Sequence, residues 1–97
     1  MIYEHAHLKI DPARAAEFEA ALPVAIQALS EAPGNKEVAF SRSVDQPGTY
    51  LLRAGWDRIS DHLEVFPTTP QAATLGAAIA GFFVEPPLVI HFEAEDI

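Results

Sequence analysis

Hydrophobic and polar residues alternate along four stretches of the chain, which is typical of strands that bury one face. Residues 36–44 and 49–56 alternate on either side of the turn Asp45-Gln46-Pro47-Gly48 and predict a hairpin. Residues 88–95 predict a last strand. The first stretch, residues 2–10, separates two sets of side chains, with Ile2, Ala6, Leu8 and Ile10 on one face and Tyr3, His5, His7 and Lys9 on the other.

Apolar residues recur at helical spacing between these strands. Asp11-Pro12 predicts a helix start and Ala32-Pro33-Gly34 its end, and Pro23 inside the run predicts a kink or break. Asp57 predicts the cap of a short helix over residues 58–66. The first helix is expected to bury Phe18, Leu22, Ala25, Ile26 and Leu29, and a helix beginning at Thr69-Pro70 is expected to bury Ala72, Leu75, Ile79 and Phe82.

The order of these elements is strand, helix, strand, strand, helix pair, strand. This βαββαβ pattern predicts an α+β ferredoxin-like sandwich, in which helices cover one face of an antiparallel four-stranded sheet. No linker or repeat divides the chain, so we expect one domain over residues 1–97. The uncovered face suits solvent or a second copy of the sheet, and it is predicted to carry Tyr3, His5, His7, Lys9, Ala39, Ser41, Ser43, Leu51, Arg53, Val89, His91 and Glu93.

Charge and composition narrow the choice of partners. Fourteen acidic and six basic residues give a net charge of −8, which argues against binding to nucleic acid or to anionic membranes. There is no cysteine, so neither disulfides nor thiolate chemistry is expected. No apolar run approaches the ~20 residues of a membrane span, and no signal-peptide pattern is present, so a cytoplasmic protein is expected.

From Tyr50 to Glu95 the chain resembles the antibiotic biosynthesis monooxygenase (ABM) family of dimeric α+β barrel proteins. Trp56, His62 and Phe66 match the family's strand-ending tryptophan, helical histidine and phenylalanine, and Thr69-Pro70 and Pro87-Leu-Val-Ile-His-Phe-Glu match its later motifs. The first half is similar only in layout. The resemblance implies a homodimer with facing sheets and a pocket in each protomer. Members include cofactor-independent oxygenases of aromatic polyketides and quinols, haem-degrading enzymes and proteins without a known reaction, so family alone does not define function.

Two departures from the family pattern affect this interpretation. The first strand lacks the asparagine of haem-degrading members, and Phe66 stands at the offset of their iron-binding histidine. Haem degradation is therefore disfavoured, and no cofactor is expected. The last helix contains Gly76 and ends near Gly81, which indicates either close packing or a roomier pocket because glycine costs helix stability.

Trp56 and His62 are the candidate catalytic residues. The helical stripe Ile59, His62, Leu63 and Phe66 turns His62 toward the sheet, and alternation places Trp56 on the helix-covered face. Trp56 would form an aromatic wall and His62 a base or hydrogen-bond donor. The alternative is that His62 only hydrogen-bonds inside a small core. The expected substrate-binding residues are Tyr50, Phe66 and Phe82.

His5, His7 and His91 are predicted to share the other face of the sheet, away from Trp56. Three histidines suit a divalent metal, but we favour the interpretation that they line the dimer's inner cavity, and we expect no metal site. The sequence thus predicts a homodimer that binds a small aromatic or quinonoid compound and acts as a cofactor-independent monooxygenase. The alternatives are a non-catalytic ligand-binding or structural dimer and a histidine-based metalloprotein.

Overall fold

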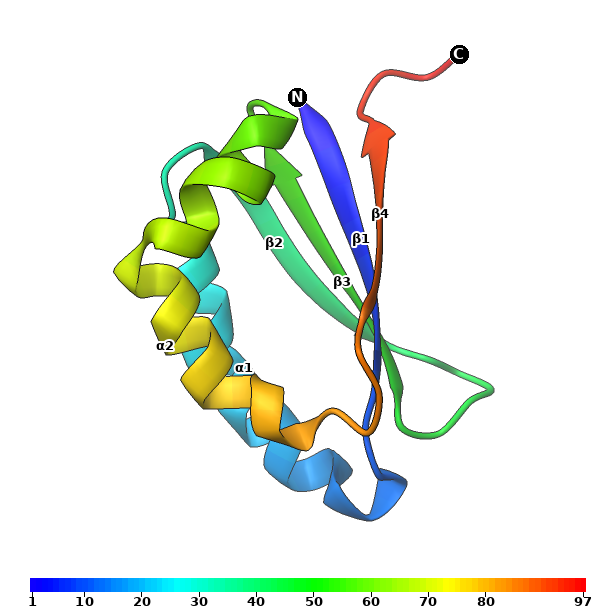
Figure 1. Ribbon diagram of the computed structural model, residues 1–97. Helices are drawn as coiled ribbons and strands as arrows, with labels where there is room; N and C mark the ends of the chain where they lie inside the picture. Colours follow the sequence, from blue (N-terminus) through cyan, green and yellow to red (C-terminus); the bar gives the residue numbers. More distant parts are fainter.

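The computed structural model describes all 97 residues and forms a four-stranded antiparallel sheet with helices on one face (Figure 1). The strand order is β2-β3-β1-β4, so the first and last strands are neighbours. The predicted α+β ferredoxin-like fold is confirmed. None of the helices is long and apolar enough to cross a bilayer. The main elements are β1 (Ile2–Lys9), α1 (Ala15–Ser30), β2 (Asn35–Arg42), β3 (Thr49–Trp56), α2 (Pro70–Ile79) and β4 (Leu88–Glu93).

Side-chain caps start the first and last helical segments where the sequence predicts, but the predicted cap at Asp57 is wrong: the turn after β3 has no side-chain cap hydrogen bond, and the Asp57 carboxylate pairs with Lys36 at 3.3 Å. The Asp11 carboxylate accepts the Ala13 N–H at 2.9 Å and opens a 3-10 turn, Pro12–Arg14, which leads into α1. The Thr69 hydroxyl accepts the Ala72 N–H at 3.3 Å at the start of α2. Helix α1 runs without interruption through Pro23, so the predicted break there is wrong.

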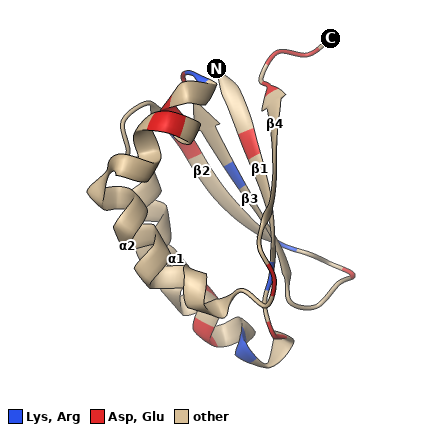
Figure 2. Ribbon diagram, viewed as in Figure 1, with Lys and Arg blue, Asp and Glu red and all other residues tan.

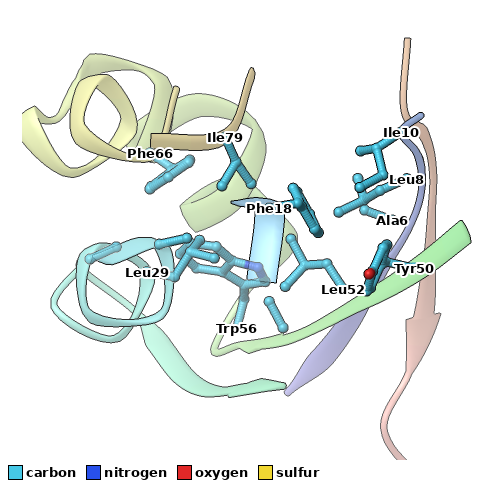
Figure 3. Close-up of a cluster of buried hydrophobic side chains, with 13 residues drawn as sticks. Ala6, Leu8, Ile10, Phe18, Leu29, Tyr50, Leu52, Trp56, Phe66 and Ile79 are labelled. Carbon is cyan, nitrogen blue, oxygen red and sulfur yellow. The ribbon is translucent and has the colours of Figure 1, made fainter. Parts of the chain in front are cut away.

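The core lies between the helices and the sheet (Figure 3). Trp56, Phe18 and Leu29 are its largest fully buried side chains. The predicted alternation of β3 is confirmed, since Tyr50, Leu52, Ala54 and Trp56 are all buried. Two predictions of burial are wrong. Ile26 of α1 is 38% exposed. Val44, which the alternation of residues 36–44 places on the same face as Val38 and Phe40, is fully exposed because β2 ends at Arg42.

The face assigned to β4 from sequence is also wrong. In the antiparallel register, Glu4 pairs with His91 and Ala6 with Val89, and paired residues share a face. Val89, His91 and Glu93 therefore lie on the helix-covered side. The open face receives Leu88, Ile90 and Phe92 instead. A shift of one residue in register moves every side chain of a strand to the other face, and sequence alternation alone does not set that register.

The helical segment after β3 differs from the predicted helix over residues 58–66. It contains a π-helical turn, Asp61–Val65, in which the Phe66 N–H bonds to the Asp61 carbonyl, and then a 3-10 turn, Phe66–Thr68. The wider π turn changes which side chains face inward. Ile59 and Leu63 are 45% and 55% exposed, so their place on the predicted inward stripe is wrong, whereas Asp61 is buried.

Candidate active site

Trp56 and His62 stack against each other at the end of β3. Their ring centroids are 5.2 Å apart with an interplanar angle of 16°. Phe66 packs against both rings, at 5.5 Å from Trp56 and 6.2 Å from His62. The structure therefore brings together three of the five residues that the sequence analysis assigned to the site.

Buried Asp61 ties the turn that carries His62 to the rest of the protein. Its Oδ2 accepts the Arg58 N–H at 3.1 Å, and its side chain lies against Gly34 in the loop between α1 and β2. Gly34 has a φ of +80°, and a Cβ built there would fall 2.4 Å from that carboxylate oxygen. Only glycine suits both the left-handed backbone and this close approach, so Gly34 and Asp61 together hold His62 over the sheet.

Glu4 of β1 is the site residue that the sequence analysis missed. It is 5% exposed and its Oε1 accepts the Trp56 Nε1–H at 3.1 Å. The same oxygen lies 3.3 Å from His62 Nε2. The signal was present, because strict alternation places Glu4 on the buried face between Ile2 and Ala6, where an isolated carboxylate is costly and therefore unusual.

His91 of β4 completes the arrangement. Its Nε2 lies 2.8 Å from His62 Nδ1, directly beside Glu4 in the β1–β4 register. The prediction that His91 lies away from Trp56 is wrong, for the register reason given above. We call Glu4, Trp56, His62 and His91 the polar cluster.

His5 and His7 lie on the opposite face of the sheet from His91. Residues of β1 alternate, so the face that holds Glu4 excludes both of these histidines. The three histidines therefore do not converge in one chain, and no group of three or more metal-binding side chains forms elsewhere. The predicted common face of the three histidines is wrong.

Burial sets the protonation of the polar cluster. Burial raises the pKa of Glu4, although the hydrogen bond from Trp56 opposes this. Burial, and to a smaller extent His91, lowers the pKa of His62 to about 4, so His62 is neutral at pH 7. Nε2 of His62 faces the Glu4 carboxylate at 3.3 Å, and Nδ1 faces His91 Nε2 at 2.8 Å. Both ring nitrogens of His62 thus face side chains of the polar cluster.

An apolar cavity of about 200 Å³ lies beside Glu4, between α2 and the sheet. Nine of its 12 lining residues are hydrophobic, and Glu4 is the only charged one. Helix α2, which forms one wall, carries no charged residue (Figure 2). A Cβ at Gly76 of this wall would meet nothing within 4 Å, so the interpretation of a roomier pocket applies at Gly76.

The other predicted substrate-binding residues lie elsewhere. Tyr50 donates its hydroxyl to Glu19 Oε2 at 2.6 Å, and Phe82 packs under the Arg14 guanidinium at 4.3 Å. Tyr50 and Phe82 both contact Phe18, at 4.7 and 5.5 Å between ring centroids. Tyr50 and Trp56 stand at opposite ends of β3 and lie apart within the core cluster (Figure 3). The cavity lining contains neither Tyr50, Phe82 nor Phe66, so substrate binding by these three side chains stays a prediction.

The fold and cavity define a small α+β protein with room for a ligand beneath its helices. The sequence profile described as antibiotic biosynthesis monooxygenase matches residues 1–72, and the chain belongs to that family. The match includes the first half, where the sequence analysis found similarity only in layout.

Solved structures of related proteins share the fold. A protein from Bordetella bronchiseptica, named for the same family, is 30% identical with a TM-score of 0.91, over 97% of this chain and 96% of that one. One from Caulobacter crescentus CB15 is 27% identical with a TM-score of 0.80, over 98% and 90% of the two chains. A Streptomyces coelicolor monooxygenase in complex with nanaomycin D is 19% identical with a TM-score of 0.78, over 99% and 88%. No protein of curated function matches the sequence.

Proposed function

We propose that this protein binds a small aromatic or quinonoid compound and oxidises it with O₂ without a cofactor. The observation that carries the proposal is the apolar cavity whose only charged lining group, Glu4, is held by Trp56 and His62. Membership of the ABM family supports it. So does the related Streptomyces coelicolor monooxygenase, which holds the ligand nanaomycin D.

The proposed reaction needs little from the protein beyond a shaped, water-poor site. A phenol or hydroquinone loses its hydroxyl proton, and the anion gives one electron to O₂. The resulting radical and superoxide combine into a carbon-bound peroxide, which takes the proton back and loses water to leave a new carbonyl. Trp56 and His62, the predicted catalytic residues, are proposed to act through Glu4, because both lie against its Oε1 and neither lines the cavity.

The predicted aromatic contacts fit this proposal in different ways. Phe66 supports the stacked pair of Trp56 and His62 from one side. Tyr50 and Phe82 pack on Phe18 outside the cavity. Of the three predicted substrate-binding residues, the proposal therefore keeps Phe66, as the support of the Trp56–His62 pair.

Oxygen uptake tests the proposal directly. Metal-depleted protein is given a panel of anthrones, hydroquinones and catechols, and wild type is compared with Trp56→Phe and His62→Gln, which preserve much of the side-chain volume. Glu19→Gln is the control, since Glu19 accepts a hydrogen bond from another aromatic residue of β3 and lies away from the cavity. We expect protein-dependent uptake that falls in the first two variants and persists in the control. Uptake no faster than autoxidation with every compound contradicts the oxygenase.

A ligand-binding protein without oxygenase activity is the second candidate. The two ring nitrogens of His62 face Glu4 and His91, and His62 does not line the cavity, so no imidazole nitrogen is aimed at a ligand there. The same cavity would then hold an aromatic ligand without oxidising it. Saturable binding together with an absence of oxygen uptake would favour this function.

We further propose a cytoplasmic homodimer in which the open sheet faces of two copies meet. Leu88, Ile90 and Phe92 of β4 are 60%, 42% and 48% exposed on that face, and covering them removes apolar surface from water. Light scattering at micromolar concentration should give twice the 10.5 kDa mass of one chain. A measured mass of one chain contradicts the dimer.

A further inference from the structure

We propose that Glu4, rather than His62, is the residue that meets the ligand, binding its hydroxyl group and accepting the hydroxyl proton. His62 and His91 are then positioning residues. This inference rests on the proposed function of the same cavity.

The contacts of Glu4 leave one oxygen for a ligand. Trp56 and His62 both approach Oε1, at 3.1 and 3.3 Å, and neither holds Oε2. Glu4 lines the cavity, whereas Trp56 and His62 do not. The carboxylate is therefore the polar group of the cluster that a bound molecule reaches.

His62 is arranged to hold Glu4 rather than to act alone. Its Nε2 faces the carboxylate and its Nδ1 faces His91 Nε2. Neither nitrogen faces the cavity, so His62 cannot take a substrate proton without leaving one of these contacts. His91 holds the His62 ring on one side, and the ring in turn lies against the carboxylate.

The cavity defines the chemical class of the ligand. An apolar cavity of about 150 Å³ in another protein holds benzene, so about 200 Å³ suits a single substituted ring. The lining contains no cationic residue, and Glu4 repels a second negative charge. The expected ligand is a neutral phenol or hydroquinone of one ring, without a carboxylate or phosphate group.

The proposed proton transfer runs from the ligand hydroxyl group to Glu4. The O–H bond of the ligand breaks, an O–H bond forms on Glu4 Oε2, and the negative charge moves from the carboxylate to the phenolate oxygen. Glu4 then returns this proton to the peroxide formed with O₂. A positioned general base of this kind contributes about 10²- to 10⁴-fold to a rate.

Phenol and toluene form the matched probe pair, because they share one ring and differ only in that phenol carries a hydroxyl group where toluene carries a methyl group. Their dissociation constants are measured by fluorescence of Trp56, the only tryptophan, for wild type, Glu4→Gln and Glu19→Gln. Wild type and Glu19→Gln should prefer phenol by about tenfold or more, since a hydrogen bond to a charged acceptor is strong. Glu4→Gln should lose the preference. Gly76→Val, which places methyl groups in the cavity, should weaken binding of both probes alike.

The outcomes separate this inference from the oxygenase proposal. Equal binding of phenol and toluene by wild type, or a phenol preference that survives in Glu4→Gln, overturns the role of Glu4. Oxygen uptake that Glu4→Gln retains also overturns it. A Glu4-dependent phenol preference without any oxygen uptake supports recognition by Glu4 and contradicts the oxygenase. If Glu4→Gln does not fold, wild type alone decides, because equal binding of phenol and toluene overturns the role of Glu4 and a phenol preference supports it.

Discussion

Two carboxylates on the helix-covered side of the sheet each accept a hydrogen bond from an aromatic residue of β3, yet their electrostatic states are opposite. Glu4 accepts from Trp56, and burial raises its pKa. Glu19 accepts from Tyr50, but it is also paired with Arg42, whose hydrogen bonds lower the pKa of Glu19 to about 2. The same local motif thus accompanies a raised pKa of Glu4 at the Trp56 end of β3 and a lowered pKa of Glu19 at the Tyr50 end.

The difference lies in the third partner. Arg42 gives Glu19 a full positive charge at the edge of the fold, which makes an ordinary structural tie between β2 and α1. Glu4 has neutral donors and an empty apolar space beside it. Environments that push the pKa values of two similar groups apart indicate which one is available for proton chemistry. The contrast with Glu19 therefore indicates that Glu4 is the carboxylate available for proton chemistry.

The largest expected difference between the Trp56–Glu4 pair and the Tyr50–Glu19 pair is in their contribution to the free energy of unfolding. Trp56→Ala should destabilise the fold by about 3–5 kcal/mol, because it removes a fully buried ring and the donor to buried Glu4. Tyr50→Phe keeps the ring and removes one hydrogen bond to a partly exposed carboxylate, so it should cost only about 1 kcal/mol. Urea unfolding of both variants checks the ranking. Equal losses would mean that the two aromatic–carboxylate pairs are alike.

The second prediction concerns what holds His62 over Glu4. Gly34→Ala should cost about 2 kcal/mol, because it strains a backbone with positive φ and forces Asp61 away. His62 should then lose its stack on Trp56, which the fluorescence of Trp56 reports. Gly81→Ala is the matched control, since a Cβ there meets nothing within 4 Å. Unchanged Trp56 emission in a destabilised Gly34→Ala would show that another contact places His62.

The third prediction concerns how the stability of the protein depends on pH, which should differ between the His62–Glu4 site and Glu19. Unfolded His62 takes up a proton near pH 6.5 but folded His62 only near pH 4, so stability falls as pH falls through this window. The loss should be about 1 kcal/mol, because the site is partly solvated and solvent screens part of the effect of burial. Glu4 acts in the opposite sense, since its raised pKa adds stability below pH 4.5 that is lost as pH rises through the folded value.

Glu19 responds in a different pH window. Its lowered pKa gives stability that is present above pH 4.5 and lost as pH falls toward about 2. His62→Gln should therefore flatten the stability profile between pH 6.5 and 4, while Glu19→Gln should alter it only below about 4.5. Unfolding curves over the full range measure both. A wild-type slope between pH 6.5 and 4 that survives in His62→Gln would assign it to another group.

Local pattern was enough to predict the four strands, the two long helices and half of the polar cluster. Alternation in β3 and the caps at Asp11 and Thr69 depend on neighbouring residues, and each was confirmed. The roles of Glu4 and His91 depend on which residue of β4 pairs with which residue of β1, a register between distant strands that single-sequence alternation leaves open. The π turn was equally hidden, because a helical stripe assumes the α-helical period.

The smallest predicted effect concerns the wall of the cavity. Gly76→Ala should stabilise the protein by about 0.5 kcal/mol, because alanine favours the helix and its Cβ enters open space. The methyl group also narrows the cavity beside Glu4, so single-ring ligands should bind more weakly although the fold is firmer. Thermal unfolding and phenol titration on the same sample measure both effects. Increased stability with unchanged phenol affinity would place the ligand away from α2. The cavity beside Glu4 would then no longer distinguish Glu4 from Glu19 as the carboxylate that binds a ligand.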